Sequence, residues 1–288
     1  RSGRAALRSH RHQPRRPPLG ALSHMDQSYT ATDVQRLRQL TGAGMLDCKR
    51  ALEEAAGDVE AAGKLLRERG QAAAGRRAGR ENAQGAVAMV VDGPGALVEL
   101  RCETDFVAKS PDFVGLVQDL ASLVATKGEE AVAERRADVD ALTVALGEDV
   151  ALGRVVRFEA SEETLVDGYL HVQNDRGVNG VLVELVGGSH ALAHEVAVHI
   201  AFARPTYLRR EDVPAAEVAA ERATLETISR NEGKPEAAMT KIVEGRLNGW
   251  FKGRCLLEQA FVRDEKQTIA DLLGPARVAR FAQVVVGG

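Results

Sequence analysis

The stretch GALVEL at residues 95–100 returns almost unchanged as GVLVEL at residues 180–185. A strand-like run precedes each copy, AVAMVV at 86–91 and YLHVQ at 169–173, and a turn-rich link joins the two members of each pair. A helix-like segment follows each copy. Two units with the same order of hairpin and helix predict a duplicated α+β core built on antiparallel sheets.

Each predicted helix should bury one face against its sheet. The positions at helical spacing are Phe113, Val117, Leu120 and Val124 in the first unit and Ala191, Leu192, His194, Val198 and Ile200 in the second. Ser189, a candidate N-cap, lies four residues after Leu185, whereas Ser110 lies ten residues after Leu100. The six extra residues fall around CETDFVAK at 102–109. Because functional residues concentrate on such additions to a common scaffold, this insertion is the first candidate site.

Residues 30–70 predict a small module of three short helices. Its apolar positions are Val34, Leu37 and Leu40, then Met45, Cys48, Leu52 and Ala55, then Val59, Ala62 and Leu66. The glycines of TGAG at 41–44 separate the first two helices. A unit of this size has a minimal core, so its outer faces are free for a partner. The pattern resembles a ubiquitin-associated-type domain. The pair Met45 and Leu46 is either part of its core or an exposed contact.

The chain begins with an arginine-rich segment. Residues 1–24 contain six Arg, three His and no acidic residue, so removing them changes the formal net charge from −3 to −9. The segment fits either an organellar transit peptide or residues that precede a true start at Met25. We expect residues 1–29 to be a disordered leader. The acidic body argues against broad binding to phosphate backbones, and we expect no direct nucleic-acid partner.

The rest of the composition is that of a globular protein, with 44% hydrophobic and 27% charged residues. No apolar run approaches the 18 residues of a membrane helix, so no membrane association is expected. Cys48, Cys102 and Cys255 are too few and too far apart for a disulfide framework or a zinc site. These features favour a cytoplasmic location.

Two long motifs carry a family resemblance. TGAGMLDCKRAL at 41–52 and CETDFVAK at 102–109 resemble, in order and separation, the two signature stretches of bacterial elongation factor Ts. HIAFARPTYLRREDVP at 199–214 and EGKPEAAMTKIVEGRLNGWF at 232–251 are similar to the later region of that family. The resemblance runs from about residue 30 to the end, and two long motifs in one chain make it specific.

The resemblance implies a guanine-nucleotide exchange factor that binds the GDP form of the GTPase elongation factor Tu. It implies no bond chemistry, no cofactor and no metal site. By position, Asp105 and Phe106 resemble the pair that enters between helices of the GTPase and disturbs its magnesium and phosphate site, with Thr104 and Val107 beside them. The remaining implied contact residues are Met45, Leu46, Leu146, Gly147 and His171. The alternative is that Thr104 and Asp105 cap a helix and Phe106 anchors the core.

The later part of the chain predicts a helical hairpin, with helices at 213–232 and 235–251 and Pro235 at a helix start. The resemblance implies that residues 205–251 project from the core and take part in homodimerisation, although packing on the same subunit is the alternative. TIADLLG predicts a short helix, and VARFAQVVV a last strand that completes the second sheet. The sequence has Arg101 where many family members have Asn, and it does not show the extra C-terminal helical segment that is found in some bacterial members.

The predicted division of the chain is as follows: a leader at 1–29, the three-helix module at 30–70, a linker or partly helical connector at 71–84, a first core unit at 85–160, a second core unit at 161–204 and 252–288, and the hairpin at 205–251.

The sequence is less consistent with two other classes of protein. A zinc peptidase needs His-Glu-x-x-His, but HEVAVH at 194–199 places the second histidine one residue too far, and His190 with His194 lacks the glutamate and a third ligand. No phosphate-binding loop of the Gly-x4-Gly-Lys-Ser/Thr type is present. A helical adaptor for ubiquitin-like or nucleic-acid partners would leave residues 102–109 without a role.

Overall fold

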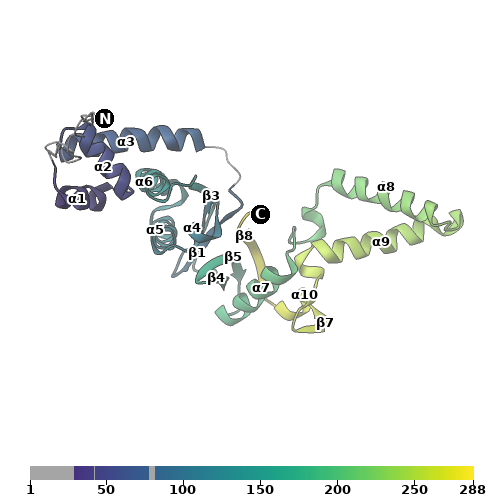
Figure 1. Ribbon diagram of the computed structural model, residues 1–288. Helices are drawn as coiled ribbons and strands as arrows, with labels where there is room; N and C mark the ends of the chain where they lie inside the picture. The colour runs from purple at the N-terminus through teal and green to yellow at the C-terminus, as the bar shows by residue number, and fades with distance from the viewer. Residues whose placement is uncertain (1–28, 42, 78–81) are drawn as a thin grey trace, which may run out of the picture.

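The computed structural model describes residues 29–41, 43–77 and 82–288 (Figure 1). Residues 1–28 of the leader predicted at 1–29, and residues 78–81 of the predicted linker, lie outside these ranges. Tyr29, which was predicted to belong to the leader, is instead buried in the first module. Its hydroxyl donates to Glu53 Oε1 at 2.9 Å.

Two three-stranded antiparallel sheets form the centre of the molecule. The first contains β1 (Gln84–Val91), β2 (Gly95–Cys102) and β3 (Ala151–Phe158), and the second contains β4 (Thr164–Gln173), β5 (Arg176–Val186) and β8 (Arg277–Val285). The orders are β1-β2-β3 and β4-β5-β8, so each copy of the repeated stretch is a central strand. The predicted α+β class with antiparallel sheets is confirmed, and β8 completes the second sheet as expected.

The core has four layers in the order helix, sheet, sheet, helix. Helix α5 (Pro111–Lys127) covers the outer face of the first sheet and α7 (His190–Ala203) that of the second. The inner faces pack against each other, with Leu97 and Leu182 in the shared cluster. A Cβ on Gly180 would lie 2.5 Å from Leu97 Cδ2, so this close approach of the sheets needs glycine. Burial of β2 and β5 on both faces explains their almost continuous apolar runs.

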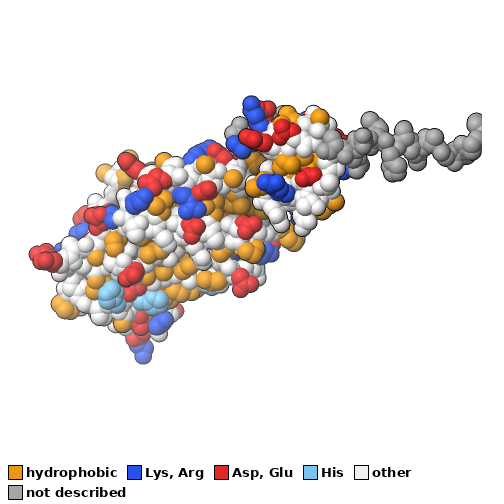
Figure 2. Space-filling view, turned by 90° about the vertical axis from the view of Figure 1, so that its left-hand side faces the viewer, with side chains coloured by type: hydrophobic (Ala, Val, Ile, Leu, Met, Phe, Trp, Pro, Cys, Tyr) orange, Lys and Arg blue, Asp and Glu red, His pale blue; other side chains and the backbone are white. Residues whose placement is uncertain are grey.

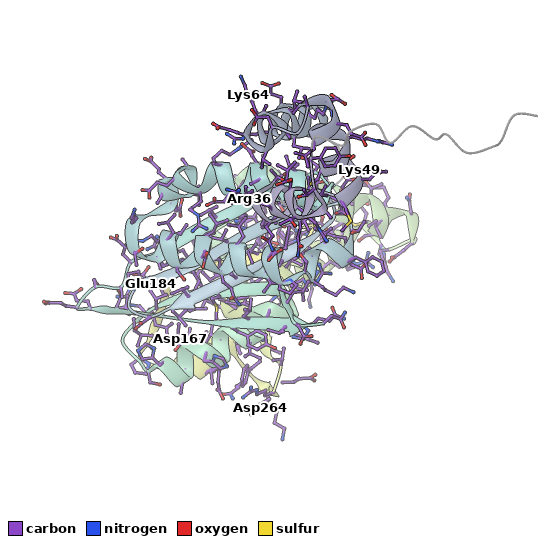
Figure 3. All side chains as sticks on the ribbon, turned by 60° about the vertical axis from the view of Figure 1, so that its left-hand side comes forward. Arg36, Lys49, Lys64, Asp167, Glu184 and Asp264 are labelled. Atoms are coloured by element: carbon purple, nitrogen blue, oxygen red, sulfur yellow. The ribbon has the colours of Figure 1, made fainter. Side chains whose placement is uncertain are left out.

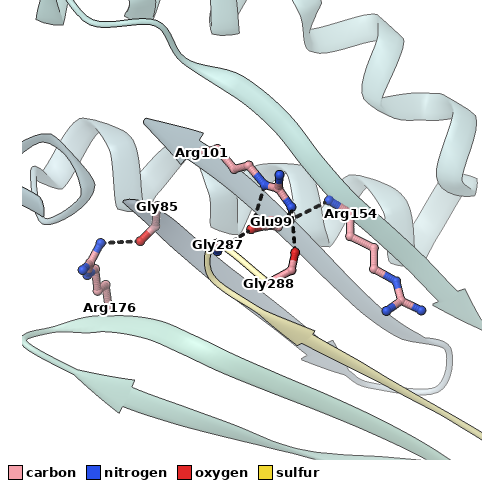
Figure 4. Close-up of polar contacts among 7 residues, drawn as sticks. All are labelled: Gly85, Glu99, Arg101, Arg154, Arg176, Gly287 and Gly288. Atoms are coloured by element: carbon pink, nitrogen blue, oxygen red, sulfur yellow. Dashed lines mark hydrogen bonds and ion pairs between the residues drawn. The ribbon is translucent and has the colours of Figure 1, made fainter. Parts of the chain in front are cut away.

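The glutamate in each copy of the repeat is buried as well, because an arginine accompanies it. Glu99 is 1% exposed and forms an ion pair with Arg101, with 2.9 Å between Oε1 and Nε (Figure 4). Its carboxylate also accepts from the backbone N–H groups of Arg154 and Gly287. Glu184 forms an ion pair with Arg280, with 2.5 Å between Oε2 and Nε. Arg101, one of the departures from the family pattern, therefore neutralises a buried charge in this chain.

The predicted buried face of α5 is confirmed, whereas that of α7 is wrong. Phe113, Val117, Leu120 and Val124 are all buried on α5. On α7 the buried residues are Ala193, Val196, Ala197, His199 and Ile200, so only Ile200 was predicted. Apolar residues surround almost the whole of α7, which makes its periodicity ambiguous. The small alanines face the sheet because they let the helix approach closely, while His194 bonds to the sheet through Gly168 O at 2.8 Å.

The first module consists of α1 (Ala31–Thr41), α2 (Met45–Glu54) and α3 (Val59–Arg77). Leu37, Cys48, Leu52, Ala62 and Leu66 form its core. Helix α3 continues through the first part of the segment predicted as linker or partly helical connector. Alanine and arginine there are good helix formers, which favours this continuation. Helix α3 packs against α6 (Arg136–Leu146), where a Cβ on Gly70 would lie 2.6 Å from Val144 Cγ1.

The insertion in the first unit forms its own short helix, α4 (Asp105–Ala108), between β2 and α5. The chain then passes from α5 through a 3₁₀ segment, Glu129–Arg135, and α6 to β3. The second unit has no counterpart to α4: only a short turn with Gly187 and Gly188 separates β5 from α7.

The helical hairpin projects from the core, as Figure 1 shows. It consists of α8 (Ala215–Asn231) and α9 (Met239–Arg254), with 3₁₀ turns at Arg210–Asp212 and Glu236–Ala238. Val213, Leu247, Phe251 and Cys255 form a small cluster at its base. The chain leads from α9 to β8 through a further 3₁₀ turn (Leu256–Glu258), β6 (Ala260–Phe261), β7 (Asp264–Thr268) and α10 (Ile269–Leu273). The short helix expected before the last strand is therefore present as α10.

Candidate partner-binding surface

Helix α4 is a single turn whose residues differ sharply in their exposure to solvent. Thr104 is its N-cap, and the Thr104 hydroxyl accepts from Val107 N at 3.4 Å. Ala108 is buried and Val107 packs against the core of the first unit. Asp105 and Phe106 face outward. The predicted capping role of Thr104 is confirmed, and its effect is to present the next two residues to solvent.

Phe106 is not a core residue. Its side chain is 80% exposed, so the alternative that it anchors the core is wrong. Lys109 Nζ lies 5.4 Å from the centre of the ring and partly covers it. A large aromatic residue on a short, capped turn therefore leaves its apolar area unburied in the free protein.

Asp105 is ionised and held by the same lysine. Its Oδ2 lies 2.6 Å from Lys109 Nζ, and this interaction lowers the pKa of the Asp105 carboxyl below its ordinary value. The charge of Arg176 lowers the pKa of Asp105 further. Asp105 therefore stays negatively charged to lower pH than a free aspartate would.

The turn before α4 is tied to a distant loop. Glu148 lies directly after Leu146 and Gly147, and its Oε2 accepts from Glu103 N at 3.1 Å and from Thr104 N at 2.9 Å. The Thr104 hydroxyl donates to Glu148 Oε1 at 2.5 Å. Below the turn, the buried Cys102 thiol donates to Thr104 O, and burial raises the pKa of Cys102 to about 12.

Leu146 and Gly147 thus lie on a loop that is bonded to the start of α4. Gly147 ends α6 with φ of 74° and ψ of 15°, a left-handed conformation that favours glycine. It is exposed, and a Cβ there would meet nothing within 4 Å. Leu146 is half-buried against the core of the first unit. The structure therefore brings together two stretches that the sequence separates by about 40 residues.

Met45 and Leu46 lie on the first module, at the start of α2, and each is 60% exposed. The alternative that they belong to the core of the module is therefore wrong. Leu40 is also exposed and lines a cleft of about 330 Å³ between the module and α6, together with Ala141 and Val144. Basic side chains of the module, Arg36, Lys49 and Lys64, extend into solvent (Figure 3).

His171 lies on the exposed last part of β4. Its Nδ1 is 3.2 Å from the Tyr169 hydroxyl, and the Tyr169 ring also meets His194 edge to face. Histidine side chains are visible among apolar ones on the face shown in Figure 2. The described residues show no contact between His171 and α4. The same hairpin of β4 and β5 carries Arg176 directly after its turn, and the charge of Arg176 lowers the pKa of Asp105.

Two residues of this surface were not singled out from the sequence. Glu148 is part of ALGED, and Lys109 ends CETDFVAK, yet neither was predicted to interact with the insertion. The Lys109 contact could have been found, since Asp105 and Lys109 are spaced i, i+4. The Glu148 contact had no local signal, because it depends on how α6 returns to the sheet.

The described part of the chain contains no cluster of three or more His, Cys, Asp or Glu residues able to hold a metal ion. His190 pairs with Asp167, with 2.9 Å between Nδ1 and Oδ2, and His194 bonds to backbone. No helix in the described ranges is long and apolar enough to cross a membrane.

Comparison with known proteins identifies the family. A family model described as Elongation factor TS matches residues 103–288. This chain belongs to the elongation factor Ts family. Among relatives, the elongation factor Ts of Kineococcus radiotolerans is 46% identical over 275 residues, which cover 90% of this chain and 99% of the relative. Those of Clavibacter michiganensis and Acidothermus cellulolyticus are 44% and 45% identical over the same shares.

Membership of the elongation factor Ts family makes the protein a nucleotide exchange factor of translation elongation. It also implies elongation factor Tu as the partner. The family motifs on which the sequence prediction rested therefore led to the right family. The alternative of a helical adaptor without exchange activity is not favoured.

Proposed function

We propose that α4 is the wedge with which this elongation factor Ts opens the nucleotide site of elongation factor Tu. The observation that carries the proposal is the 80% exposure of Phe106 on a turn that is capped by Thr104 and braced by Glu148. Phe106 enters an apolar pocket between helices of the GTPase, and Asp105 follows it. The shift of those helices removes groups that hold the magnesium ion and the phosphates.

The energetics of this step come from surface that is already exposed. Full burial of a Phe side chain contributes on the order of 2 kcal/mol. Little of this stabilisation is realised in the free protein, because the ring is exposed to water. Asp105 adds a charge-assisted hydrogen bond if it meets N–H groups at a helix N-terminus of the GTPase. GDP and Mg²⁺ stabilise each other in such sites, so displacing the ligands of the metal weakens both.

Release and rebinding follow from linkage. The factor binds the nucleotide-free GTPase more tightly than the GDP-bound form, so it weakens GDP binding by the same coupling free energy. Excess nucleotide in turn displaces the factor. The cycle needs no bond to be made or broken by this chain, so we assign it no enzymatic chemistry.

The other predicted contact residues extend the surface around this wedge. Leu146 and Gly147 lie beside α4 because of the Glu148 bonds, and Met45 and Leu46 add an apolar contact on the first module. His171 contributes an exposed ring from the second unit. Contacts on several elements would orient the GTPase so that Phe106 meets its pocket.

The domain architecture suits this role. We assign residues 29–77 to a ubiquitin-associated-like module, because Tyr29 is buried in it and α3 ends at Arg77. We assign 85–160 to the first core unit, 161–204 and 252–288 to the second, 205–251 to the hairpin, and the segment between the module and the first core unit to a connector. Support for duplication comes from the central strands, which carry GALVEL and GVLVEL, and from the serine caps of α5 and α7. We further propose self-association through the hairpin, a cytoplasmic location and no direct contact with nucleic acid.

Release of a fluorescent GDP analogue from a purified bacterial elongation factor Tu tests the proposal. The full chain should accelerate release at catalytic concentration, and the rate should saturate with the concentration of the GTPase. Addition of EDTA alone gives the rate expected when the magnesium is removed and serves as a reference. Release that is no faster with the protein than without it would refute exchange activity for this chain.

A further inference from the structure

The start of α4 and the end of α6 form one hydrogen-bonded junction. The Glu148 carboxylate takes three donors from the other segment: Glu103 N at 3.1 Å, Thr104 N at 2.9 Å and the Thr104 hydroxyl at 2.5 Å. In the opposite direction, Glu103 Oε1 accepts from Asp149 N at 2.9 Å. Each segment therefore supplies one carboxylate that binds the backbone of the other.

This junction supports a helix that is too short to be stable alone. Helix α4 has four residues, and isolated helices of this length do not form in water because nucleation is unfavourable. The N–H groups of Glu103 and Thr104 lie before the helix and have no partner within it. Glu148 satisfies both. The same carboxylate accepts from the Thr104 hydroxyl, whose oxygen in turn accepts from Val107 N.

We propose that Glu148 is a positioning residue for nucleotide exchange, which rests on the proposed function of α4. It holds the Thr104 cap, and through the cap it sets the direction in which Asp105 and Phe106 project. Because Glu148 adjoins Gly147, its bonds also fix the position of the loop of Leu146 and Gly147 relative to the wedge. Glu148 itself need not touch the GTPase.

The expected consequence is a change in population. Without Glu148 the turn samples several orientations, and only one of them can bind the GTPase. The apparent affinity for the GTPase is then reduced in proportion to the fraction of molecules in that orientation. Hydrogen bonds to a charged group are among the stronger ones in proteins, so loss of this set should lower exchange efficiency about ten- to a hundredfold.

The experiment measures kcat/KM for release of a fluorescent GDP analogue from elongation factor Tu by the full-length chain. Glu148→Ala removes all three bonds, whereas Glu148→Gln keeps one acceptor oxygen and should lose less activity. Glu134→Ala is the matched control, because it removes an equal charge from an exposed carboxylate that pairs only at the surface with Lys127. Circular dichroism and thermal unfolding report whether each variant folds.

A double-mutant cycle separates positioning from a general structural effect. If Glu148 acts through the wedge, Glu148→Ala should cost less than about twofold in a chain that already carries Phe106→Ala. Equal losses in both backgrounds would overturn the proposal, as would full activity of Glu148→Ala. If Glu148→Ala does not fold, the same cycle is run with Glu148→Gln, and the same two results decide. A wild-type chain without exchange activity would instead reject the proposed function.

Discussion

Replacing Phe106 with alanine tests the central step of the proposed mechanism. The ring is 80% exposed in the free protein, so almost its whole area remains available for burial in a partner. At the usual value for a phenylalanine side chain, this corresponds to about 2 kcal/mol of partner-dependent stabilisation. If the contact is made when the nucleotide site opens, Phe106→Ala should lower kcat/KM for GDP release roughly thirtyfold.

The same exposure predicts that the variant folds normally. The ring contributes no core packing, and its contact with Lys109 at 5.4 Å accounts for about 0.5 kcal/mol at an exposed position. The midpoint of thermal unfolding should therefore stay within about 2 °C of wild type. If the ring were a core residue, truncation would instead cost about 3 to 5 kcal/mol of folding free energy.

Phe202 supplies a matched control. It lies near the end of α7, is 78% exposed and is outside the proposed surface. Phe202→Ala removes the same amount of exposed apolar area and should leave GDP release unchanged. Equal losses in the two variants would refute the reasoning, because they would show that exposed aromatic area in general, and not the position on α4, governs exchange.

Two further predictions follow from packing and from burial. A Cβ on Gly70 would lie 2.6 Å from Val144 Cγ1, so Gly70→Ala should displace the first module from α6. In measurements of GDP release, this variant should raise the KM for elongation factor Tu severalfold and change kcat little. Gly115→Ala on α5, where a Cβ would meet nothing within 4 Å, should leave both constants unchanged, and a similar effect of the two substitutions would contradict the docking argument. Burial lowers the pKa of His199, so the unfolded chain binds a proton more readily and stability should fall as pH drops below about 6.5. Thermal unfolding between pH 7.5 and 5.5 should show a shallower pH dependence in His199→Gln, and identical slopes would count against a neutral buried imidazole.

Much of the fold could be predicted from local patterns. The repeated strand, the serine caps of α5 and α7 and the helical spacing of apolar residues in the three-helix module are local properties. The structure follows them, except that Leu40 and Met45 of the module are exposed. The buried face of α7 could not be predicted, because apolar residues surround that helix. The shape of the sheet decides that the face with small alanine residues packs against it. The length of α3 was left open for a similar reason, since its last turns carry no periodic apolar face.

The candidate site divides in the same way. The sequence by itself determined that one of two similar units carries an insertion with an aromatic residue, and the family motifs determined what kind of protein carries it. It left open whether Phe106 is core or contact. That question depends on which atoms surround the ring, and only the tertiary structure decided it.

The tertiary structure also decided how the insertion is held. Glu148 reaches Thr104 across 44 residues of chain, and Arg176 lies near Asp105 because the hairpin of β4 and β5 packs against β1. Contacts at such separations form only when the sheets and α6 are in place, so no local pattern encodes them. The sequence determined the elements and the presence of the insertion, whereas long-range packing determined the direction, the charge environment and the exposure of its side chains.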